Sequence, residues 1–182
     1  GYKLLFGRGC NMGQDASSSW GRRVAIMVRA PVEPVITNPQ GDADLEMLLA
    51  SGRWLEVMVP TGNGQHMFIA TFYGISGASL DPTLKKQNEE LLARALLRKK
   101  QMQSVPYFLC GDFNIDPSKS QVICNSIRAG ICHDIFQEIF KGSAPPTYRK
   151  GGISPQMNGK GTTRIDTILG NMSATHACNS GK

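Results

Sequence analysis

The clearest pattern of apolar positions begins at 24–28, where an apolar run lies between Gly21 and Pro31. Such a short, bounded run predicts a buried β-strand. Apolar residues then alternate over 55–59, and a β-rich run follows at 67–73, after the turn residues 62–64 (Gly-Asn-Gly). Two β-type segments joined by this turn chemistry predict a β-hairpin.

Other segments repeat their apolar residues at helical spacing. The pair Asp81-Pro82 supplies an N-cap and a helix-compatible first residue, and the leucines and alanine at 84, 91, 92, 95 and 96 follow it. This pattern predicts a helix that runs to about residue 104. Shorter helical patterns occur at 45–49, 117–130 and 135–140, and glycines end the first two of them.

Two further apolar runs bring polar residues to the ends of strands. The run 105–110 predicts a buried strand, and Asp112 and Asn114 come directly after it. The run 164–169 predicts another strand, which contains Asp166. Residues 1–20 carry no comparable pattern. The interleaved strands and helices predict a single α/β or α+β domain over residues 1–182.

Composition places the chain among soluble globular proteins. It has 182 residues, of which 41% are apolar and 19% charged, with no apolar run long enough to cross a bilayer and no secretion signal at its start. The five cysteines are odd in number and lack metal-site spacing, so we expect reduced thiols in an intracellular protein. The formal charge of +6 permits attraction to phosphate-rich partners.

The residues at the strand ends are the candidate chemistry. A carboxylate such as Asp112 can orient or deprotonate a water molecule, and an amide such as Asn114 can donate to an oxygen that gains charge. Both residue types are also common in turns, where they bind nearby backbone. Tyr73 can donate its phenolic hydrogen to a phosphate oxygen or simply lie at the edge of the core. Asp166 needs a partner, either Arg164 in a salt bridge or a histidine.

Several segments, taken in order, resemble the endonuclease/exonuclease/phosphatase superfamily of metal-dependent phosphoesterases. Residues 21–28 (GRRVAIMV) are similar to its GGVAI-type strand, and residues 68–74 (FIATFYG) to the strand with its active-site tyrosine. Residues 107–117 (YFLCGDFNIDP) contain the GDFN hallmark. Residues 146–148 (PTY) and 164–169 (RIDTIL) are similar to its PTF and RIDYIL pattern. The resemblance covers residues 21–169.

This resemblance implies a four-layer α/β sandwich, with two packed mixed sheets flanked by helices, and Mg²⁺ as the cofactor, with Mn²⁺ as a substitute. It assigns Asp112 to the attacking water and Asn114 to the charged transition state, and it places both near the metal. Tyr73 would contact the scissile phosphate, and Asp166 would hold the imidazole of a distant histidine in the right tautomer.

The chain also departs from the family pattern. The family has an Asn-bearing strand and a metal-binding Glu before the GGVAI-type strand, and a Ser-Asp-His strand after RIDYIL. Asn11 and Asp15 lack the strand context that the first pair needs, and His176 does not lie in the sequence expected for the last. We therefore expect a fragment, incomplete at both termini, with little or no activity. A degenerate, non-catalytic homologue with the same fold is the alternative.

The basic segment between 141 and 164 contains no acidic residue and favours a nucleic-acid substrate, with DNA preferred. Arg149, Lys150 and Arg164 are its candidate phosphate contacts. A retroelement-type or repair-type endonuclease fits this interpretation, although residues 72–77 (FYGISG) argue against a close match to abasic-site repair enzymes. A phosphatase of small phosphoesters, a non-enzymatic binding module and an unrelated α/β domain remain alternatives. No membrane partner is expected.

Overall fold

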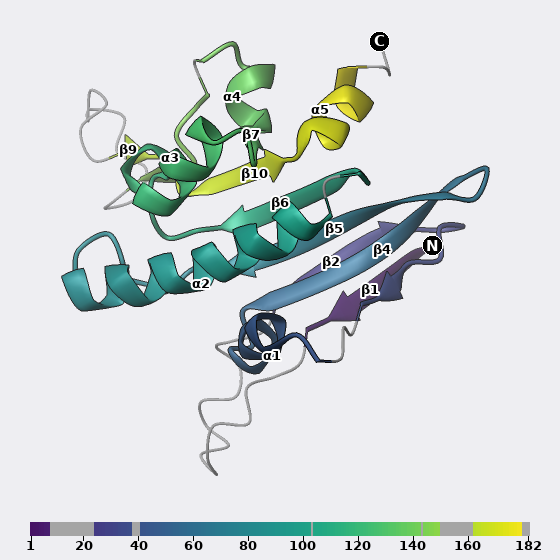
Figure 1. The fold of residues 1–182 in the computed structure, drawn as a ribbon, viewed down its shortest axis with the longest axis horizontal. Helices are drawn as coiled ribbons and strands as arrows, with labels where there is room; N and C mark the ends of the chain where they lie inside the picture. Colours follow the sequence, from purple (N-terminus) through teal and green to yellow (C-terminus); the bar gives the residue numbers. More distant parts are fainter. Residues whose placement is uncertain (8–23, 38–40, 103, 143, 150–161, 180–182) are drawn as a thin grey trace.

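A six-stranded mixed sheet forms the centre of the molecule (Figure 1). The computed structural model describes residues 1–7, 24–37, 41–102, 104–142, 144–149 and 162–179. The strand order across the sheet is β3 (Val35–Ile36), β4 (Trp54–Gly62), β5 (Gln65–Tyr73), β6 (Tyr107–Asp112), β10 (Asp166–Gly170) and β7 (His133–Asp134). The pair β5–β6 is parallel and the other pairs are antiparallel. The predicted hairpin is therefore β4–β5, and the two predicted strands with polar ends are β6 and β10.

Two small antiparallel sheets complete the strands. The first joins β1 (Tyr2–Phe6) to β2 (Ala25–Arg29), and the second joins β8 (Tyr148–Arg149) to β9 (Thr162–Thr163). Strand β2 overlaps the predicted 24–28 run and ends one residue later, but β1 was not predicted. Of its five side chains, only Leu5 is partly buried and the others are exposed. The strand therefore lacks the alternation of apolar and polar residues that predicts a half-buried strand.

The helices are α1 (Ala43–Ala50), α2 (Pro82–Gln101), α3 (Gln121–Arg128), α4 (Ile135–Ile139) and α5 (Met172–Asn179), with a 3₁₀ turn at Pro117–Lys119. The predicted N-cap is present, because the Asp81 carboxylate accepts hydrogen bonds from the amides of Thr83 and Leu84 at 2.7 and 3.0 Å. Helix α5 was not predicted. Of the described helices, none combines the length and the apolar character needed to span a membrane.

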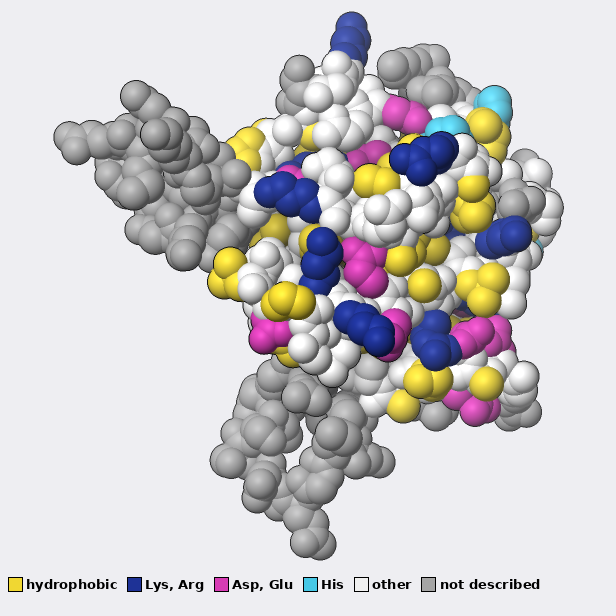
Figure 2. Space-filling view, turned by 60° about the vertical axis from the view of Figure 1, so that its left-hand side comes forward, with side chains coloured by type: hydrophobic (Ala, Val, Ile, Leu, Met, Phe, Trp, Pro, Cys, Tyr) yellow, Lys and Arg dark blue, Asp and Glu magenta, His cyan; other side chains and the backbone are white. Residues whose placement is uncertain are grey.

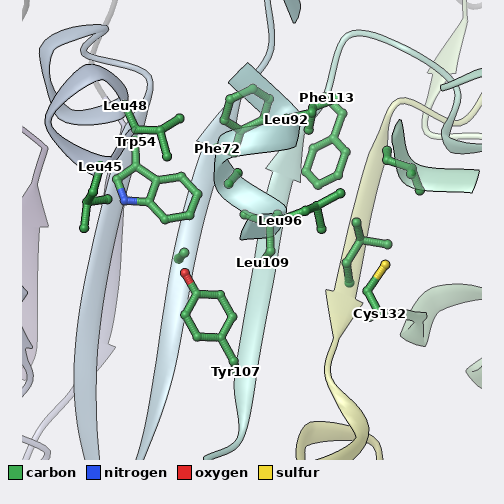
Figure 3. Close-up of a cluster of buried hydrophobic side chains, with 14 of the residues drawn as sticks. Leu45, Leu48, Trp54, Phe72, Leu92, Leu96, Tyr107, Leu109, Phe113 and Cys132 are labelled. Atoms are coloured by element: carbon green, nitrogen blue, oxygen red, sulfur yellow. The ribbon is translucent and has the colours of Figure 1, made fainter. Parts of the chain in front are cut away.

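The main core lies between the six-stranded sheet and the helices on one of its faces. Trp54, Phe72, Tyr107, Leu109 and Phe113 point into it from the strands and the turn after β6 (Figure 3). Leu45 and Leu48 of α1, Leu92 and Leu96 of α2, and Ile123 of α3 cover them. Figure 1 shows α2 lying across β5 and β6.

The opposite face of the six-stranded sheet packs against the β1–β2 pair. Leu55, Val57 and Val59 of β4 form a second apolar cluster there with Val24, and Leu5 of β1 and Ile26 of β2 pack against it. Two packed sheets with helices on one outer face agree with the predicted α/β sandwich. The described part of the second sheet is one antiparallel pair, whereas a mixed sheet was expected.

Two charged groups are buried in the main core. Glu56 of β4 is 1% exposed and accepts hydrogen bonds from Arg98 at 2.9 and 3.2 Å, from Tyr107 at 2.6 Å and from Thr37 at 2.6 Å. Lys99 of α2 is fully buried, and its Nζ donates to the carbonyl of Ile131 at 2.9 Å. Both oxygens of the Glu56 carboxylate and the Lys99 ammonium thus have hydrogen-bond partners, as burial requires. The four described cysteines, at 110, 124, 132 and 178, are free thiols, as predicted.

Candidate active site

Three of the predicted site residues lie side by side where strands β5, β6 and β10 meet. Tyr73 is the last residue of β5 and pairs with Asp112, the last residue of β6. Asp112 pairs in turn with Asp166, the first residue of β10. We call Tyr73, Asp112 and Asp166 the strand-end row. The structure thus brings these residues together from segments far apart in the sequence.

The strand-end row faces away from the helices. Phe72 and Phe113, which flank Tyr73 and Asp112, are buried in the main core on the helix side. Successive side chains of a strand point to opposite faces, so Tyr73 and Asp112 point to the other side, where Tyr73 contacts the second apolar cluster. Residues in register on adjacent strands share a face, which places Asp166 with them.

Asn114 is held beside this row by the turn after β6. Its backbone has a φ of +51°, in the left-handed region that asparagine tolerates. Its amide N–H donates to Asp112 Oδ1 at 2.8 Å, and its Nδ2 donates to the carbonyl of Gly74 at 3.0 Å. Among the described residues, the side-chain oxygen of Asn114 and the second hydrogen of its Nδ2 have no partner, so both remain for a ligand.

Gly74 lets the loop after β5 lie directly against this turn. Its N–H donates to the carbonyl of Asp112 at 2.7 Å. A Cβ at this position would lie 2.1 Å from the carbonyl oxygen of Phe113, a distance that no side chain can adopt without moving the backbone. The glycine in FYG is thus required by a close backbone approach at the site.

The electrostatics of the row favour a cation. Burial raises the pKa of Asp112, and the charge of Asp166 raises it further, while the hydrogen bond from the Asn114 amide opposes both effects. No described residue donates a hydrogen bond to the Asp166 carboxylate. The backbone at Asp166 is held by Thr147, whose Oγ1 accepts hydrogen bonds from the amides of Ile165 and Asp166 at 3.1 and 3.0 Å. Two adjacent carboxylates with unused oxygens are a natural ligand pair for a positive charge.

The residues fit a divalent cation that is shared with a substrate. Asp112, Asp166 and Asn114 supply hard oxygen ligands, which Mg²⁺ prefers. Within the described ranges, however, no group of three or more His, Cys, Asp or Glu residues could hold a metal. Mg²⁺ is commonly bound by one or two carboxylates together with substrate phosphates and water, so two carboxylates suffice for that kind of site.

Two residues that the sequence analysis missed adjoin Tyr73. The Tyr73 hydroxyl lies 3.2 Å from the hydroxyl of Ser76. The Arg53 guanidinium lies 5.4 Å from the centre of the Tyr73 ring and donates to the carbonyls of Tyr73 and Gly74 at 3.2 and 2.7 Å. Extending the first strand of the predicted hairpin by two residues would have placed Arg53 opposite Tyr73.

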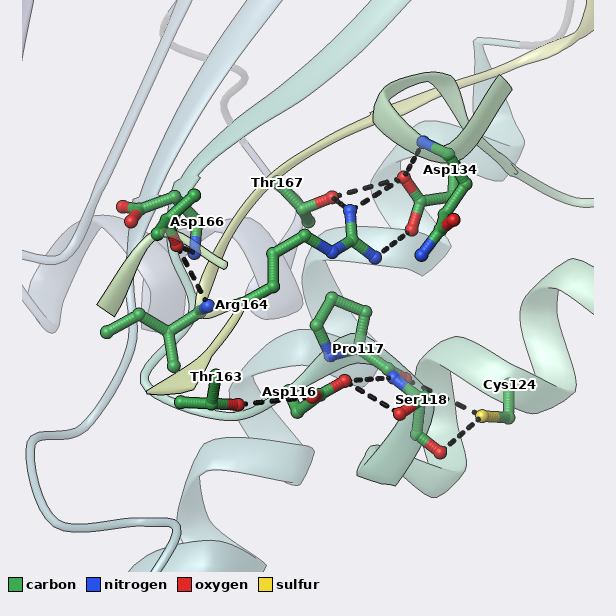
Figure 4. A network of polar contacts seen from close by, with 12 residues as sticks. Asp116, Pro117, Ser118, Cys124, Asp134, Thr163, Arg164, Asp166 and Thr167 are labelled. Atoms are coloured by element: carbon green, nitrogen blue, oxygen red, sulfur yellow. Dashed lines mark hydrogen bonds and ion pairs between the residues drawn. The ribbon is translucent and has the colours of Figure 1, made fainter. Parts of the chain in front are cut away.

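Arg164, a predicted phosphate contact, binds other side chains of the protein in the structure. It is 7% exposed and forms a buried ion pair with Asp134, donating from Nη1 at 3.0 Å, and it also donates to Thr167 at 2.7 Å (Figure 4). Its charge is therefore neutralised by Asp134, and Asp166 is not its partner. Lys150 and the side chain of Arg149 lie outside the described residues.

All three histidines lie in the described part of the chain, and none contacts Asp166. His66 packs edge-on against Phe68 near the start of β5. His133 Nδ1 lies 3.2 Å from Glu138, and His176 is exposed on α5. The histidine that the resemblance pairs with Asp166 is thus none of these.

No family model and no curated protein matches the sequence, but solved structures do. The chain is similar to an AP endonuclease from Archaeoglobus fulgidus (TM-score 0.64, 15% identity, 94% of this chain and 67% of that one). It is also similar to a Neisseria 3′ phosphatase bound to a product DNA hairpin (0.59, 20%, 95% and 68%). A third is an endonuclease/exonuclease/phosphatase family protein from Bacteroides thetaiotaomicron (0.56, 16%, 95% and 62%).

This chain spans between 60% and 68% of the lengths of the chains it resembles, while nearly all of its own length takes part in the match. The match includes the part of the chain that holds the six-stranded sheet, the β1–β2 pair packed on it and the strand-end row. The chain therefore has the fold of the endonuclease/exonuclease/phosphatase family.

Proposed function

We propose that this chain is a Mg²⁺-dependent phosphoesterase domain that acts on the phosphodiester bonds of nucleic acid. The observation that carries the proposal is the strand-end row, with Asn114 held beside it. A phenol, an amide and two carboxylates on one face can together bind a phosphate, a water molecule and a cation. Mn²⁺ would serve in place of Mg²⁺ because it prefers the same hard ligands.

Each residue has a role that its surroundings support. Asp112 orients the attacking water and accepts its proton, and a raised pKa makes a carboxylate a better base near neutral pH. Tyr73 donates its hydroxyl hydrogen to a phosphate oxygen, and Asn114 stabilises charge on the phosphate through its side chain. Asp112, Asp166 and Asn114 would hold Mg²⁺, which supplies positive charge to the phosphate oxygens.

Asp166 also remains the proposed partner of an imidazole. The three histidines of this chain do not supply it, so we expect this chain alone to bind nucleic acid with little or no hydrolysis. Binding and turnover are accordingly separate arms of the test.

Nucleic acid, and DNA in particular, is the favoured substrate class. The Neisseria phosphatase with a similar fold carries a DNA hairpin product in its structure. The formal charge of this chain is +6. Figure 2 shows Lys and Arg side chains spread over one face with Asp and Glu among them, so attraction to phosphates would be distributed rather than confined to one patch.

The test is the binding of a fluorescein-labelled DNA hairpin, followed by anisotropy with and without Mg²⁺. We expect Mg²⁺ to strengthen binding to the wild type, and Asp112→Asn to abolish this strengthening. Asp44→Asn is the control, because it removes the same charge on α1, where Asp44 pairs with Arg94. If Mg²⁺ has no effect on the wild type, or if the two variants behave alike, the proposed metal and phosphate site is wrong.

Cleavage of the same hairpin, analysed on a gel, distinguishes the alternatives. Mg²⁺-dependent cleavage that Asp112→Asn abolishes would show that this chain is itself an enzyme and would exclude the non-catalytic homologue. Turnover of p-nitrophenyl phosphate with little salt dependence, and without cleavage of DNA, would instead indicate a small-substrate phosphatase.

A further inference from the structure

A fully buried asparagine of α2 bridges the two loops that carry the candidate site. Asn88 is 0% exposed. Its Oδ1 accepts a hydrogen bond from the backbone amide of Ile75 at 2.8 Å, and its Nδ2 donates to the backbone carbonyl of Phe113 at 3.0 Å. One side chain thus binds the loop after β5 and the turn after β6 at the same time.

Such an amide is costly to bury unless both of its ends are paired. Its two partners lie next to the residues of the site. Ile75 lies between Gly74 and Ser76, and Phe113 lies between Asp112 and Asn114. The orientation of Asn88 is also fixed, because its oxygen must face an N–H group and its nitrogen a carbonyl.

The other links between these two loops come from the loops themselves. Gly74 donates to the carbonyl of Asp112, and the Asn114 side chain donates to the carbonyl of Gly74. Asn88 belongs to a different element, a helix that packs across β5 and β6 (Figure 1). It therefore ties the relative position of the two loops to the main core.

We infer that Asn88 is a positioning residue, which holds the loop after β5, with Ser76, against the turn after β6, with Asn114. The inference concerns the geometry of the same site as the proposed function and rests on it for its functional meaning. The site needs both segments at once, because the loop after β5 brings Ser76 to the Tyr73 hydroxyl and the turn after β6 carries Asn114 beside Asp112. A displacement of about 1 Å between reacting groups can reduce a rate by about 100-fold.

Two substitutions separate positioning from a general contribution to stability. Asn88→Leu removes both hydrogen bonds and keeps a side chain of similar size. Asn88→Asp keeps the acceptor for Ile75 but places an anion against the Phe113 carbonyl. When the introduced carboxyl is protonated, it has both a donor and an acceptor, as asparagine does. Burial raises the pKa of this carboxyl, so it is protonated at a higher pH than an exposed one.

The chain offers a matched control at the other end of the sheet. Asn171 is 2% exposed and also bridges backbone segments, accepting from the amides of Tyr107 and Ala174 and donating to the carbonyls of Met102 and Val105. Asn171→Leu removes a buried amide of the same kind without touching the loops of the site.

The primary measurement is amide hydrogen exchange by NMR, as protection factors relative to wild type at the same pH. In Asn88→Leu, the amide of Ile75 should exchange about five- to tenfold faster than the global loss of stability explains, since it loses an acceptor that contributes about 1 kcal/mol. The amide of Asn114 keeps its acceptor, Asp112 Oδ1, but belongs to the peptide unit whose carbonyl loses Asn88, so it should also exchange faster than the global change explains. In Asn171→Leu, the same amides should follow the global change. In Asn88→Asp, lowering the pH should restore protection at Asn114, whereas Asn88→Leu should show no such recovery.

A second measurement reads out the site without turnover. Mn²⁺ is added as a paramagnetic probe, and broadening is compared at the amides of Ser76 and Asn114. In wild type, Mn²⁺ should broaden the signals of both amides. The ratio of the two broadenings should change in Asn88→Leu and stay at the wild-type value in Asn171→Leu. If Ile75 and Asn114 respond alike in Asn88→Leu and Asn171→Leu, with no recovery at low pH in Asn88→Asp, the positioning role is refuted. If Mn²⁺ broadens neither amide in wild type, the metal site of the proposed function is wrong, and hydrogen exchange still decides the role of Asn88.

Discussion

Lys99 should make the stability of this protein depend on pH above neutrality. Its side chain is fully buried in α2, where Nζ donates to the Ile131 carbonyl and lies near the thiol of Cys132. Burial lowers the pKa of Lys99 from 10.5 to about 8, because the core disfavours the ammonium form. In the unfolded chain the lysine would have its ordinary pKa of about 10.4.

The size of the effect follows from these two values. Each pKa unit corresponds to about 1.36 kcal/mol, so the protonated lysine costs the folded state about 3 kcal/mol at pH 7. Between pH 8 and pH 10.5 the unfolded chain binds more protons at this site than the folded chain. Stability from this residue therefore rises with pH, and about 2 kcal/mol of the cost should disappear between pH 7 and pH 9.5.

The assay is urea unfolding of wild type and Lys99→Met at both pH values. Burial raises the pKa of the Cys110 and Cys132 thiols to about 11. These thiols therefore ionise more readily in the unfolded chain, which destabilises both proteins at alkaline pH. The difference between the two proteins removes most of that contribution. The wild type should gain about 2 kcal/mol relative to Lys99→Met over this range. If the free energy of unfolding of the wild type relative to that of Lys99→Met stays constant between pH 7 and pH 9.5, or falls, the reasoning is refuted.

Three other substitutions test the core, the site and the surface. Glu56→Leu should cost about 3–5 kcal/mol in urea unfolding, because it leaves the Arg98 charge buried without its partner, and adding Arg98→Leu should recover most of the loss. Gly74→Ala should cost at least about 1–3 kcal/mol, since its Cβ would overlap the Phe113 carbonyl; an unchanged midpoint would show that the loops can separate freely. Met27→Lys, on the exposed outer face of β2, should leave the unfolding midpoint within about 0.5 kcal/mol and reduce binding of the dye ANS, and unchanged dye binding would contradict this.

Much of the six-stranded sheet could be predicted because its signals are local. The alternation over 55–59 and the Gly-Asn-Gly turn define a hairpin without reference to the rest of the chain. Asp81-Pro82 likewise marks the start of α2 from two residues. The strand-end positions of Tyr73, Asp112 and Asp166 follow from where apolar runs stop or begin, although their register required the structure.

Features that depend on tertiary placement could not be predicted. Asn88 is a polar residue within an amphipathic helix, and only the packing of α2 shows that it faces two loops rather than solvent. Arg164 lies before β10 begins, so strand alternation does not fix its direction, and its proximity to Asp166 in sequence was misleading. Strand β1 was missed because Tyr2, Leu4 and Phe6 lie on an outer face that is 53–69% exposed.

The junction of β5, β6 and β10 has a consequence for how such a domain could be re-engineered. The spacing of Tyr73, Asp112 and Asp166 is set by backbone hydrogen bonds between three adjacent strands, not by the connections that join them. Beyond the turn that carries Asn114, the parts of the connection from β6 to β10 that add nothing to the sheet or the main core can therefore vary while Asp112 and Asp166 keep their register. Exchanging such surface segments between homologous chains is a route to a new substrate preference that leaves Tyr73, Asp112, Asn114 and Asp166 in place.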